Sequence, residues 1–389
     1  MLFQKMSGKR TTTSMVSPGA PFQLWSWGKN NNGQLGIGVI GASYGRSSPI
    51  QVGALTNWQS VSAGRFESLA IKTDGTLWAW GKNHYGQLGL NDVAYRSSPV
   101  QVGALATWSK IVSKYRISFA LKTDGTLWAW GRGGGGFLGL GDTVGRSSPV
   151  QVGTLATWSA ISDGYAQSFA IKTDGTLWTW GMNTKGQLGI GNVVDKSSPV
   201  QVGTLTAWRT LSCGLNHTLA IKTDGTLWAW GYNGSGRLGL GDYTHYVGYP
   251  VYGQVKWDRS SPVQVGILTT WSTVSAGSTF SAAIKTDGTL WTWGSNGSEG
   301  YLGLGDTIKR SVPVQVGTLA TWSQIGTGNR HSLAMKTNGT LWGWGHNVYG
   351  QLGLGNATSV SSPVQVGTLT SWVVIAKGSE AHHSLGLRT

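Results

Sequence analysis

The chain has 389 residues, of which 30 are Lys or Arg and 15 are Asp or Glu, so its formal net charge is +15. Charged residues make up only 12% of the chain while 61 positions are Gly, a balance that excludes a helical bundle and favours strands and turns. Cys213 is the only cysteine, which excludes a disulfide within the chain, and we expect it to be a small buried residue.

The first 21 residues are predicted to form a separate basic tail rich in Ser and Thr, in which Lys5, Lys9 and Arg10 anchor the protein to a larger assembly. The tail lacks the apolar stretch of a signal peptide, and no run in the sequence is long and apolar enough for a transmembrane helix. We therefore expect a cytoplasmic or virion-associated protein without a membrane span.

From residue 22 onward the sequence repeats itself. A phrase close to Ile-Lys-Thr-Asp-Gly-Thr-Leu-Trp-Ala-Trp-Gly begins at Ile71, Leu121, Ile171, Ile221, Ile284 and Met335, and its last part also stands at Leu24. The second Trp of the phrase recurs every 50 to 53 residues, apart from one interval of 63 residues. Seven such units build one continuous core, so residues 22–389 are predicted to be a single domain.

Each unit is predicted to hold four short strands. In the first complete unit these are 58–62, 68–72, 76–80 and 99–102, which are rich in apolar and β-branched residues and bounded by Gly, Asp or Ser. An Asp-Gly pair joins the second and third strands, because Gly supplies the positive φ of a tight hairpin turn. Apolar residues occupy both faces of the third strand, so both faces need cover, as in the radially stacked blades of a propeller. We assign 21 of the 22 Trp to this core, three to a unit.

The two ends of the chain complete one another. Residues 372–389 supply the first two strands of a unit, and residues 22–53 supply the other two. Joining them completes a seventh blade and removes free sheet edges. The sequence therefore predicts an all-β, seven-bladed β-propeller of four-stranded antiparallel blades, whose last blade is closed by the N- and C-terminal strands together.

The run Trp-Gly-x-Asn-x-x-Gly-Gln-Leu-Gly at residues 80–90 and 344–355, followed by Ser-Pro-Val-Gln-Val, resembles the regulator of chromosome condensation repeat family over residues 22–389. The close similarity of the units is most like that of bacterial or phage members. Members of the family include a nucleotide exchange factor, a plant photoreceptor and an inhibitor that caps β-lactamases, so the resemblance implies seven blades and binding through one face. The family's Gly-x-x-His-Ser/Thr motif is present in only some of the units. The resemblance does not determine the function, because one fold can serve many functions.

One side of the propeller is predicted to bind a partner protein. The loops between the first and second strands and between the third and fourth strands emerge on the same side, opposite the Asp-Gly turns, and they vary from unit to unit. We assign partner binding to the following residues of the first of these loops and the strand that follows it: Arg65, Phe66, Tyr115, Arg116, Tyr165, Gln167, Arg330 and His331.

The largest irregularity on that side is an aromatic insertion in the fourth unit, residues 243–258. It adds Tyr243, His245, Tyr246, Tyr249 and Tyr252 to the predicted contact surface. Clustered aromatic side chains often anchor protein partners. The alternative is that the insertion packs on its own blade and serves stability.

Much of the positive charge is expected to be paired locally. Lysines of the Lys-Thr-Asp-Gly turns have a neighbouring Asp, and Asp92, Asp142 and Asp306 each lie four residues upstream of an Arg. The surplus comes from scattered bases and from the tail, and it is compatible with nonspecific attraction of nucleic acid. No motif of a known nucleic-acid reader is present.

We predict no catalytic residue, metal site or cofactor, because the seven His lack metal-ligand spacing and the Gly-rich runs lack the Lys-Ser/Thr of a phosphate loop. We expect a non-enzymatic protein-binding propeller that acts as a structural or adhesion component of a larger assembly, such as a phage virion or a surface structure. Two alternatives remain open. One is a guanine-nucleotide exchange factor for a small GTPase, with Glu67 or Asp163 as the acidic residue of the rim, and the other is an inhibitor that caps an enzyme.

Overall fold

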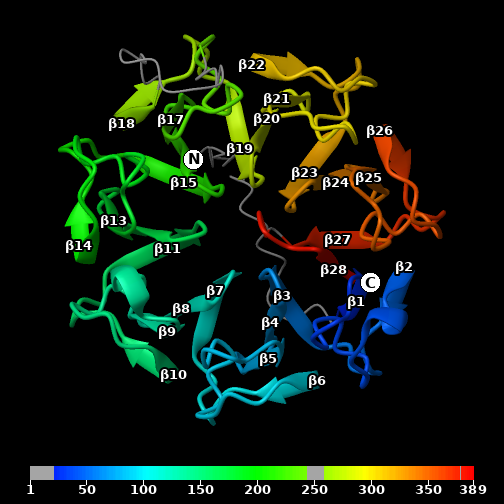
Figure 1. Cartoon of the computed structure of the whole chain (residues 1–389), viewed down its shortest axis with the longest axis horizontal. Helices are drawn as coiled ribbons and strands as arrows, with labels where there is room; N and C mark the ends of the chain where they lie inside the picture. Colours follow the sequence, from blue (N-terminus) through cyan, green and yellow to red (C-terminus); the bar gives the residue numbers. More distant parts are fainter. Residues whose placement is uncertain (1–21, 243–257, 377) are drawn as a thin grey trace, which may run out of the picture.

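Seven four-stranded antiparallel sheets lie around a central axis, as the radial arrangement in Figure 1 shows. The structure, a computed structural model, describes residues 22–242, 258–376 and 378–389. Besides the strands, the described residues hold two short 3-10 helices, η1 (Ala42–Tyr44) and η2 (Gly134–Gly136). The predicted all-β propeller of seven blades is confirmed.

In each blade the strands run from the axis to the outside in the order in which the repeated unit presents them (Figure 1). We number the blades 1 to 7, starting with the blade of β3 to β6. The innermost strands are β3 (Trp58–Ala63), β7 (Trp108–Lys114), β11 (Trp158–Asp163), β15 (Trp208–Cys213), β19 (Trp271–Ala276), β23 (Trp322–Thr327) and β27 (Trp372–Ile375). The second strands are β4 (Glu67–Lys72), β8 (Ile117–Lys122), β12 (Gln167–Lys172), β16 (His217–Lys222), β20 (Phe280–Lys285), β24 (His331–Lys336) and β28 (His383–Arg388).

The two outer positions of each blade are equally regular. The third strands are β5 (Leu77–Gly81), β9 (Leu127–Gly131), β13 (Leu177–Gly181), β17 (Leu227–Gly231), β21 (Leu290–Gly294), β25 (Leu341–Gly345) and β1 (Gln23–Gly28). The outermost strands are β6 (Arg96–Gln101), β10 (Arg146–Gln151), β14 (Lys196–Gln201), β18 (Arg259–Gln264), β22 (Arg310–Gln315), β26 (Val360–Gln365) and β2 (Arg46–Gln51).

The predicted strands of blade 1 lie within one residue of the observed ends, except for the outermost strand. That strand begins at Arg96 rather than at Pro99, because the pairing shifts register between Ala79 and Gly81 and lets Arg96 pair with Gly81. An irregularity of this kind disrupts the strict alternation of side chains, so the alternation pattern does not reveal it. The same shift occurs between the third and outermost strands of the other blades.

The seventh blade is closed by both ends of the chain, as predicted. Its strand order is β27-β28-β1-β2, so the C-terminal strand β28 lies between β27 and the N-terminal strand β1. Gln23 pairs with Arg388 and Leu24 with Leu387, which is the register that Leu77 and Ile71 adopt in blade 1. The ring therefore has no free strand edge inside this blade.

The Asp-Gly turns have the predicted chemistry. Gly75 has a φ of 79°, a left-handed conformation that favours glycine. Asp74 Oδ1 accepts hydrogen bonds from the backbone N–H and the hydroxyl of Thr76, at 2.9 and 2.6 Å. These two hydrogen bonds lower the pKa of Asp74, with a smaller contribution from nearby Lys72. Each hairpin is thus fixed by its own side chains.

Neighbouring blades are held together by a Trp that reaches across the blade boundary. The ring of Trp80 in blade 1 is fully buried, and its Nε1 donates to the backbone carbonyl of Gln34 in blade 7 at 2.9 Å. A Cβ added at Gly36 would lie 2.7 Å from this Nε1, so the Gly of Gly-Gln-Leu-Gly makes room for the indole. Equivalent hydrogen bonds of 2.9 to 3.0 Å recur at the other six boundaries.

The prediction that three Trp per unit belong to the core is right for two of them. Trp58 and Trp80 are buried, but Trp78 is only half-buried. Its Nε1 donates to Thr76 Oγ1 at 2.9 Å, and Lys72 Nζ lies 3.6 Å from the centre of its ring. The other six blades repeat this arrangement of a cation over the first Trp of Trp-x-Trp, at 3.6 to 4.5 Å. The turn lysines therefore cover aromatic faces by cation–π contacts as well as neighbouring an Asp.

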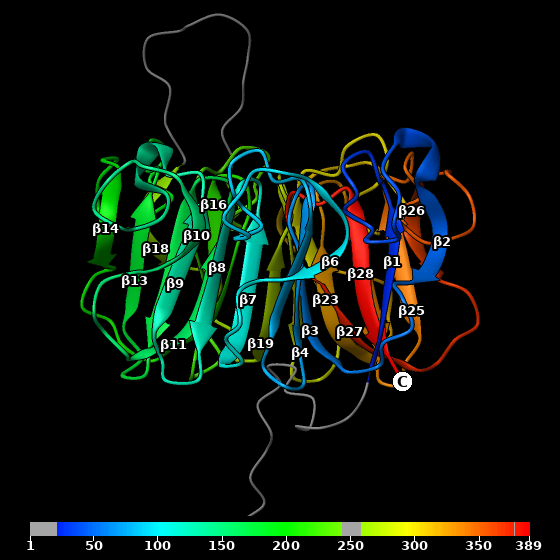
Figure 2. The same ribbon diagram turned by 90° about the horizontal axis from the view of Figure 1, so that it is seen from below.

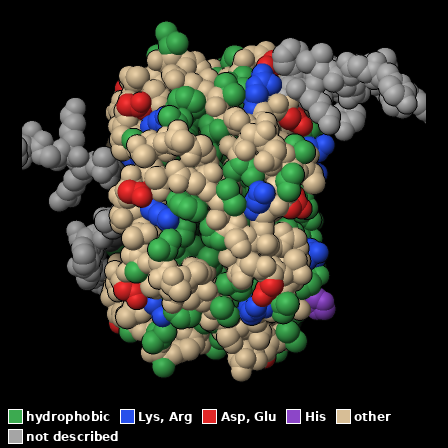
Figure 3. All heavy atoms as spheres, turned by 90° about the vertical axis from the view of Figure 1, so that its left-hand side faces the viewer, with side chains coloured by type: hydrophobic (Ala, Val, Ile, Leu, Met, Phe, Trp, Pro, Cys, Tyr) green, Lys and Arg blue, Asp and Glu red, His purple; other side chains and the backbone are tan. Residues whose placement is uncertain are grey.

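Within the described residues, four of the seven blades carry an Arg–Asp ion pair on the outer wall. Arg96 and Asp92 form one of the predicted ion pairs, and the equivalent pairs in blades 2 and 5 have distances of 2.6 Å. Figure 3 shows basic and acidic side chains close to one another at several levels of this wall, with hydrophobic side chains between them. Surface ion pairs of this exposure contribute about 0–1 kcal/mol each, so they shape the outermost loops more than they stabilise the fold.

A candidate partner-binding face

The two faces of the propeller are built differently (Figure 2). The face at the top of Figure 2, near η1, carries the loops between the first and second strands and between the third and fourth strands of each blade, and we call it the variable face. The opposite face carries the Asp-Gly turns and repeats itself closely. Each blade presents one exposed leucine there: Leu55, Leu105, Leu155, Leu205, Leu268, Leu319 and Leu369. Variation between the units is thus confined largely to one face.

The variable face is hollowed near the axis. The hollow has a volume of about 530 Å³, within the range of ligand pockets in proteins. Six of the seven blades contribute to its lining, which includes Arg65, Tyr165, Lys185, Asn216, Ser278, Thr279, Asn329, Arg330 and Glu380. We call it the central hollow. A second hollow of about 210 Å³ lies beside it, and Tyr165 lines both.

The lining of the central hollow is positively charged. Arg65, Lys185 and Arg330 contribute three cations from blades 1, 3 and 6, and Glu380 is the only acidic side chain. The hydroxyl of Ser278 donates to Glu380 Oε1 at 2.7 Å, and Arg65 Nη1 lies 3.9 Å from Glu380 Oε2. Burial raises the pKa of Glu380, because its charged form is desolvated. The carboxyl group therefore offsets only part of the positive charge around it.

Aromatic side chains lie between these cations. The rings of Tyr115 and Tyr165, from blades 2 and 3, have centroids 4.5 Å apart. The Arg65 guanidinium lies 5.1 Å from the Tyr115 centroid and 5.0 Å from that of Phe66. Arg116 lies 4.3 Å from the Tyr115 centroid. These five residues form a continuous cation–aromatic belt beside the central hollow, and its members are partly exposed.

Tyr115 occupies its place in the belt with a strained backbone. Its φ is 46°, a left-handed conformation that costs a non-glycine residue about 1–2 kcal/mol. In the same loop of blade 2, Lys114 replaces the Gly of the repeat and β7 extends as far as that residue. Lys114 is buried, and its Nζ donates to the carbonyl of Cys213 in blade 4. Strained residues of this type gather at functional sites.

The structure places six of the predicted contact residues at the surface of the variable face: Arg65, Phe66, Tyr115, Arg116, Tyr165 and Arg330. Two others, Gln167 and His331, are buried between blades and offer no contact surface. They begin the second strand of their blades, a position that faces the neighbouring blade, and Gln167 Nε2 accordingly donates to the carbonyl of Gly214 at 3.1 Å.

Glu67 occupies the same position, the first residue of the second strand, in blade 1. It therefore does not lie at the surface of the variable face. Glu67 begins β4 and is fully buried, so its burial raises its pKa to about 7. The hydroxyl of Ser113 in blade 2 donates to its Oε1 at 3.1 Å. As a candidate for displacing a bound nucleotide, Glu67 is therefore wrongly placed.

Two groups of predicted residues lie outside the described residues. They are the insertion residues Tyr243, His245, Tyr246, Tyr249 and Tyr252, and the tail residues Lys5, Lys9 and Arg10. The ends of the insertion are described: Asp242 and Arg259 form an ion pair of 2.5 Å, as the equivalent residues do in other blades. These ends lie on the variable face, whereas Phe22, which pairs with Trp58, lies on the opposite face. The described residues that border the insertion and the tail thus lie on opposite faces.

Lys185 and Glu380 were missed by the sequence reasoning, for different reasons. Lys185 lies in the loop between the third and fourth strands, at a position occupied by Tyr85 in blade 1 and by Tyr349 in blade 6. Comparing the units at this second loop would have revealed it. Glu380 lies in the first loop of blade 7, which is two residues longer than the equivalent loops, so the units do not align there.

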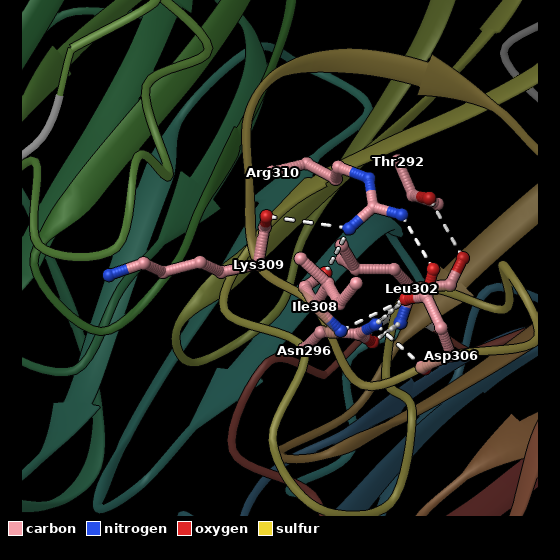
Figure 4. A network of polar contacts seen from close by, with 7 residues as sticks. All are labelled: Thr292, Asn296, Leu302, Asp306, Ile308, Lys309 and Arg310. Carbon is pink, nitrogen blue, oxygen red and sulfur yellow. Dashed lines mark hydrogen bonds and ion pairs between the residues drawn. The ribbon is translucent and has the colours of Figure 1, made fainter.

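In six of the seven blades a buried Asn holds the loop between the third and fourth strands, and in blade 2 Gly133 takes its place. In blade 5, Asn296 Nδ2 donates to the carbonyl and carboxylate oxygens of Asp306, at 2.8 and 3.0 Å (Figure 4). Its Oδ1 accepts a hydrogen bond from the N–H of Leu302 at 2.8 Å. Asp306 in turn binds Arg310 at 2.6 Å, while Lys309 points away from this network. One amide side chain therefore fixes both ends of the loop.

Replacing Asn296 with Ala is expected to lower the free energy of unfolding by about 2 kcal/mol, because the buried N–H of Leu302 loses its partner. Chemical denaturation of the purified protein measures this loss. Lys309→Ala, an exposed change in the same loop, is the control and is expected to alter the free energy by less than about 0.5 kcal/mol. Equal effects of the two changes would contradict the role of the amide.

The described residues hold strands and two short 3-10 helices. None of the helices found there is both long and apolar enough to cross a membrane. No group of three or more His, Cys, Asp or Glu side chains in the described ranges is arranged to hold a metal ion.

Solved structures with the same fold include two proteins of known source. Prp20p of Saccharomyces cerevisiae, a structure described together with its binding to Gsp1p and histones, is 19% identical, with a TM-score of 0.79 over 95% of this chain and 92% of that one. Human WBSCR16 is 20% identical, with a TM-score of 0.80 over 95% of this chain and 99% of that one. At this level of identity the likeness concerns the fold alone.

Curated relatives match only a short part of the chain. The human E3 ubiquitin-protein ligase HERC2 is 40% identical over 81 residues, which are 20% of this chain and 2% of that protein. The human probable E3 ubiquitin-protein ligase HERC3 is 42% identical over 72 residues, which are 18% of this chain and 7% of that protein. The chain thus spans a small fraction of the length of these relatives.

The model of the regulator of chromosome condensation (RCC1) repeat matches the chain seven times in succession. The matched residues are 23–71, 74–121, 124–171, 174–221, 224–284, 287–335 and 338–385. Each match crosses from the third strand of one blade to the second strand of the next, so the repeat is offset from the blade. Together with the seven-bladed fold, these matches show that the chain belongs to the RCC1 repeat family.

Proposed function

We propose that this protein is a non-enzymatic binding propeller that recognises a partner protein with its variable face. The observation that carries the proposal is the convergence of side chains that differ between the units. The belt of Arg65, Phe66, Tyr115, Arg116 and Tyr165 adjoins the central hollow, whereas the opposite face repeats itself. Aromatic and Arg side chains around a concave centre are the residue types that dominate binding energy at protein interfaces.

The proposed surface continues outward from the belt to the insertion of blade 4. The ends of that insertion, Asp242 and Arg259, lie on the variable face. The insertion contributes the aromatic residues Tyr246, Tyr249 and Tyr252 to the proposed surface. We further propose that the partner belongs to a larger assembly in which this protein is a structural or adhesion component.

The proposal is tested by affinity capture from the native source with the full chain and with a Tyr115→Ala, Tyr165→Ala double variant. The two rings form the centre of the belt, so their removal is expected to weaken binding by about 2–4 kcal/mol, which is a loss of roughly 30-fold or more. The control is Leu105→Ala, Leu155→Ala, a change in the same two blades on the opposite face. A partner lost equally with both double variants would contradict the assignment of the face.

The identity of the captured protein distinguishes the proposed role from the alternatives. Structural proteins of a virion or of a cell surface support a component of a larger assembly. Release of nucleotide from a captured small GTPase would instead establish exchange activity. A one-to-one complex that blocks the activity of a captured enzyme would establish an inhibitor.

A further inference from the structure

The central hollow gathers cations that have few acidic neighbours. Arg330 is exposed and forms no ion pair with any described residue, and Lys185 contacts the ring of Tyr232 at 5.6 Å from its centroid. Arg65 has its nearest carboxylate oxygen, on Glu380, at 3.9 Å, which is the outer limit of an ion pair. An anionic group entering the hollow would therefore meet three cations without breaking a tight ion pair.

Two buried cations lie close to residues of the hollow, and Arg237 Nη1 donates to the carbonyl of the lining residue Ser278 at 3.4 Å. Lys114 and Arg237 are 6% and 5% exposed, and each donates a hydrogen bond to a backbone carbonyl oxygen. Burial lowers the pKa of Arg237 to about 10, so its guanidinium remains charged at neutral pH. Charges in such a low-dielectric environment act on a nearby ligand more strongly than charges in water.

Two buried histidines of the variable face have basic residues near them, and the two sets of basic residues differ. Burial is the main cause that lowers the pKa of His382 to about 3, and Arg65, Lys29 and Arg330 lower it further. Burial also lowers the pKa of His217 well below its usual value, with further contributions from Arg237 and Lys114. Positive charge thus acts both at His382 in blade 7 and at His217 in blade 4.

The shape of the hollow favours a side chain over a polynucleotide. Its cations stand around one concave centre, whereas single strands are bound along grooves in which a row of cations follows the backbone. The amide groups of Asn216 and Asn329 and the hydroxyl of Thr279 also line the hollow, and such groups can donate hydrogen bonds to a carboxylate. The volume of about 530 Å³ accommodates one or a few residues of a peptide.

We propose that the central hollow receives a carboxylate side chain, Asp or Glu, from an acidic segment of the partner protein. In this arrangement Lys185 and Arg330 hold the carboxylate from opposite walls, and Arg65 lies between the incoming group and Glu380. The belt of Phe66, Tyr115 and Tyr165 contacts the flanking residues of the segment. This inference rests on the proposed function, since it names the chemistry of the partner at the same face.

The inference is tested by titrating the full chain with a short polyglutamate peptide, the matching polyglutamine peptide and an oligothymidylate, followed by fluorescence anisotropy. We expect polyglutamate alone to bind, and its affinity to fall as salt is added, because exposed charges are screened. Lys185→Glu and Arg330→Glu are each expected to weaken binding about tenfold or more, because each replaces attraction with repulsion.

The matched control is Lys309→Glu, which makes the same change of charge on an exposed side chain of blade 5 that points away from its loop network. It is expected to retain binding within about twofold, since Lys309 does not line the hollow and exposed charges are screened by salt. Circular dichroism of all three variants checks that they fold. Failure of polyglutamate to bind, equal weakening by Lys309→Glu, or equal binding of oligothymidylate would overturn the inference.

The native partner distinguishes failure of the carboxylate-binding inference from failure of the proposed function. A native partner that is lost with the Tyr115→Ala, Tyr165→Ala variant but is unaffected by Lys185→Glu would leave the protein-binding face in place and remove its preference for a carboxylate. A native partner that is insensitive to the belt variant would remove the proposed function itself.

Discussion

Acidification from pH 7 to pH 5 is expected to lower the free energy of unfolding by about 5 kcal/mol, through His residues buried in the uncharged form. Burial lowers the pKa of His331, His382 and His383 to about 3, and that of His217 well below its usual value. Unfolding returns each imidazole to a pKa of about 6.5. At a pH between the folded pKa and the unfolded pKa, each His is protonated in the unfolded chain but not in the folded protein. The stabilisation from these uncharged His residues is therefore complete above pH 6.5 and is lost as the pH falls.

Glu67 acts in the opposite direction. Its folded pKa of about 7 lies above its value in the unfolded chain, so the folded state holds the extra proton and stability falls as the pH rises through that range. One proton from Glu67 set against four from the His residues leaves about three. Because the raised pKa of Glu380 acts in the same direction as that of Glu67, the free energy of unfolding is expected to change by at most roughly 4 kcal/mol per pH unit, near pH 5.

Urea denaturation at a series of pH values measures this slope. His331→Gln and His383→Gln are each expected to reduce it by about 1.4 kcal/mol per pH unit, the value for one proton. Gln167 occupies the equivalent position in blade 3, which shows that Gln fits there. His84→Gln, at an exposed site, is the control. A free energy of unfolding that is the same at pH 7 and pH 5 would contradict the account.

Removal of residues 383–389 is expected to abolish cooperative folding. These residues form β28, which pairs with β27 on one side and with β1 on the other. Leu385 and Leu387 are fully buried in the core shared with blade 1. Without β28 the N-terminal strands lose their attachment and the ring opens, so two blade faces are exposed to water. Thermal denaturation followed by circular dichroism is expected to show no cooperative transition.

A circular permutant keeps the residues of β28 and the closed ring but moves the chain ends to another blade. It therefore serves as the control for the truncated chain. Thr389 and Gln23 stand in the register of Thr73 and Thr76, so joining them through Asp-Gly reproduces the Thr-Asp-Gly hairpin of the other blades. With new ends placed in the Asp-Gly turn of blade 4, between β16 and β17, this variant is expected to fold with a thermal midpoint within about 5 °C of the parent chain. A truncated chain that melts as cooperatively as the permutant would show that closure is not required.

The fold could be predicted closely from the sequence because the pattern of each strand occurs in seven units. Three local patterns are confirmed: the Asp-Gly turn, the apolar residues on both faces of the third strand, and the half-units at the chain ends. The half-burial of Trp78 was missed, because alternation identifies the face of a side chain but not its distance from the edge of the blade. The cation over its ring depends on pairing between two strands, which the turn sequence alone does not show.

The candidate site could be predicted only in outline. Variation between the units indicated the loops of Arg65 and Tyr115, which the structure places at the surface of the variable face, since loop residues there are not needed for packing. It also indicated Gln167 and His331, which vary because each fits a different neighbouring blade. The central hollow itself arises only when loops from six blades meet at the axis, so no single unit contains it.

Hydrogen exchange of the full chain with and without its captured native partner tests the central claim most directly. We expect slowed exchange in the loops around the central hollow, at residues 64–67, 114–117, 164–167 and 328–331, with no change at the Asp-Gly turns or near Leu105 and Leu155. Protection confined to the turns and the exposed leucines would place the partner on the opposite face and contradict the account.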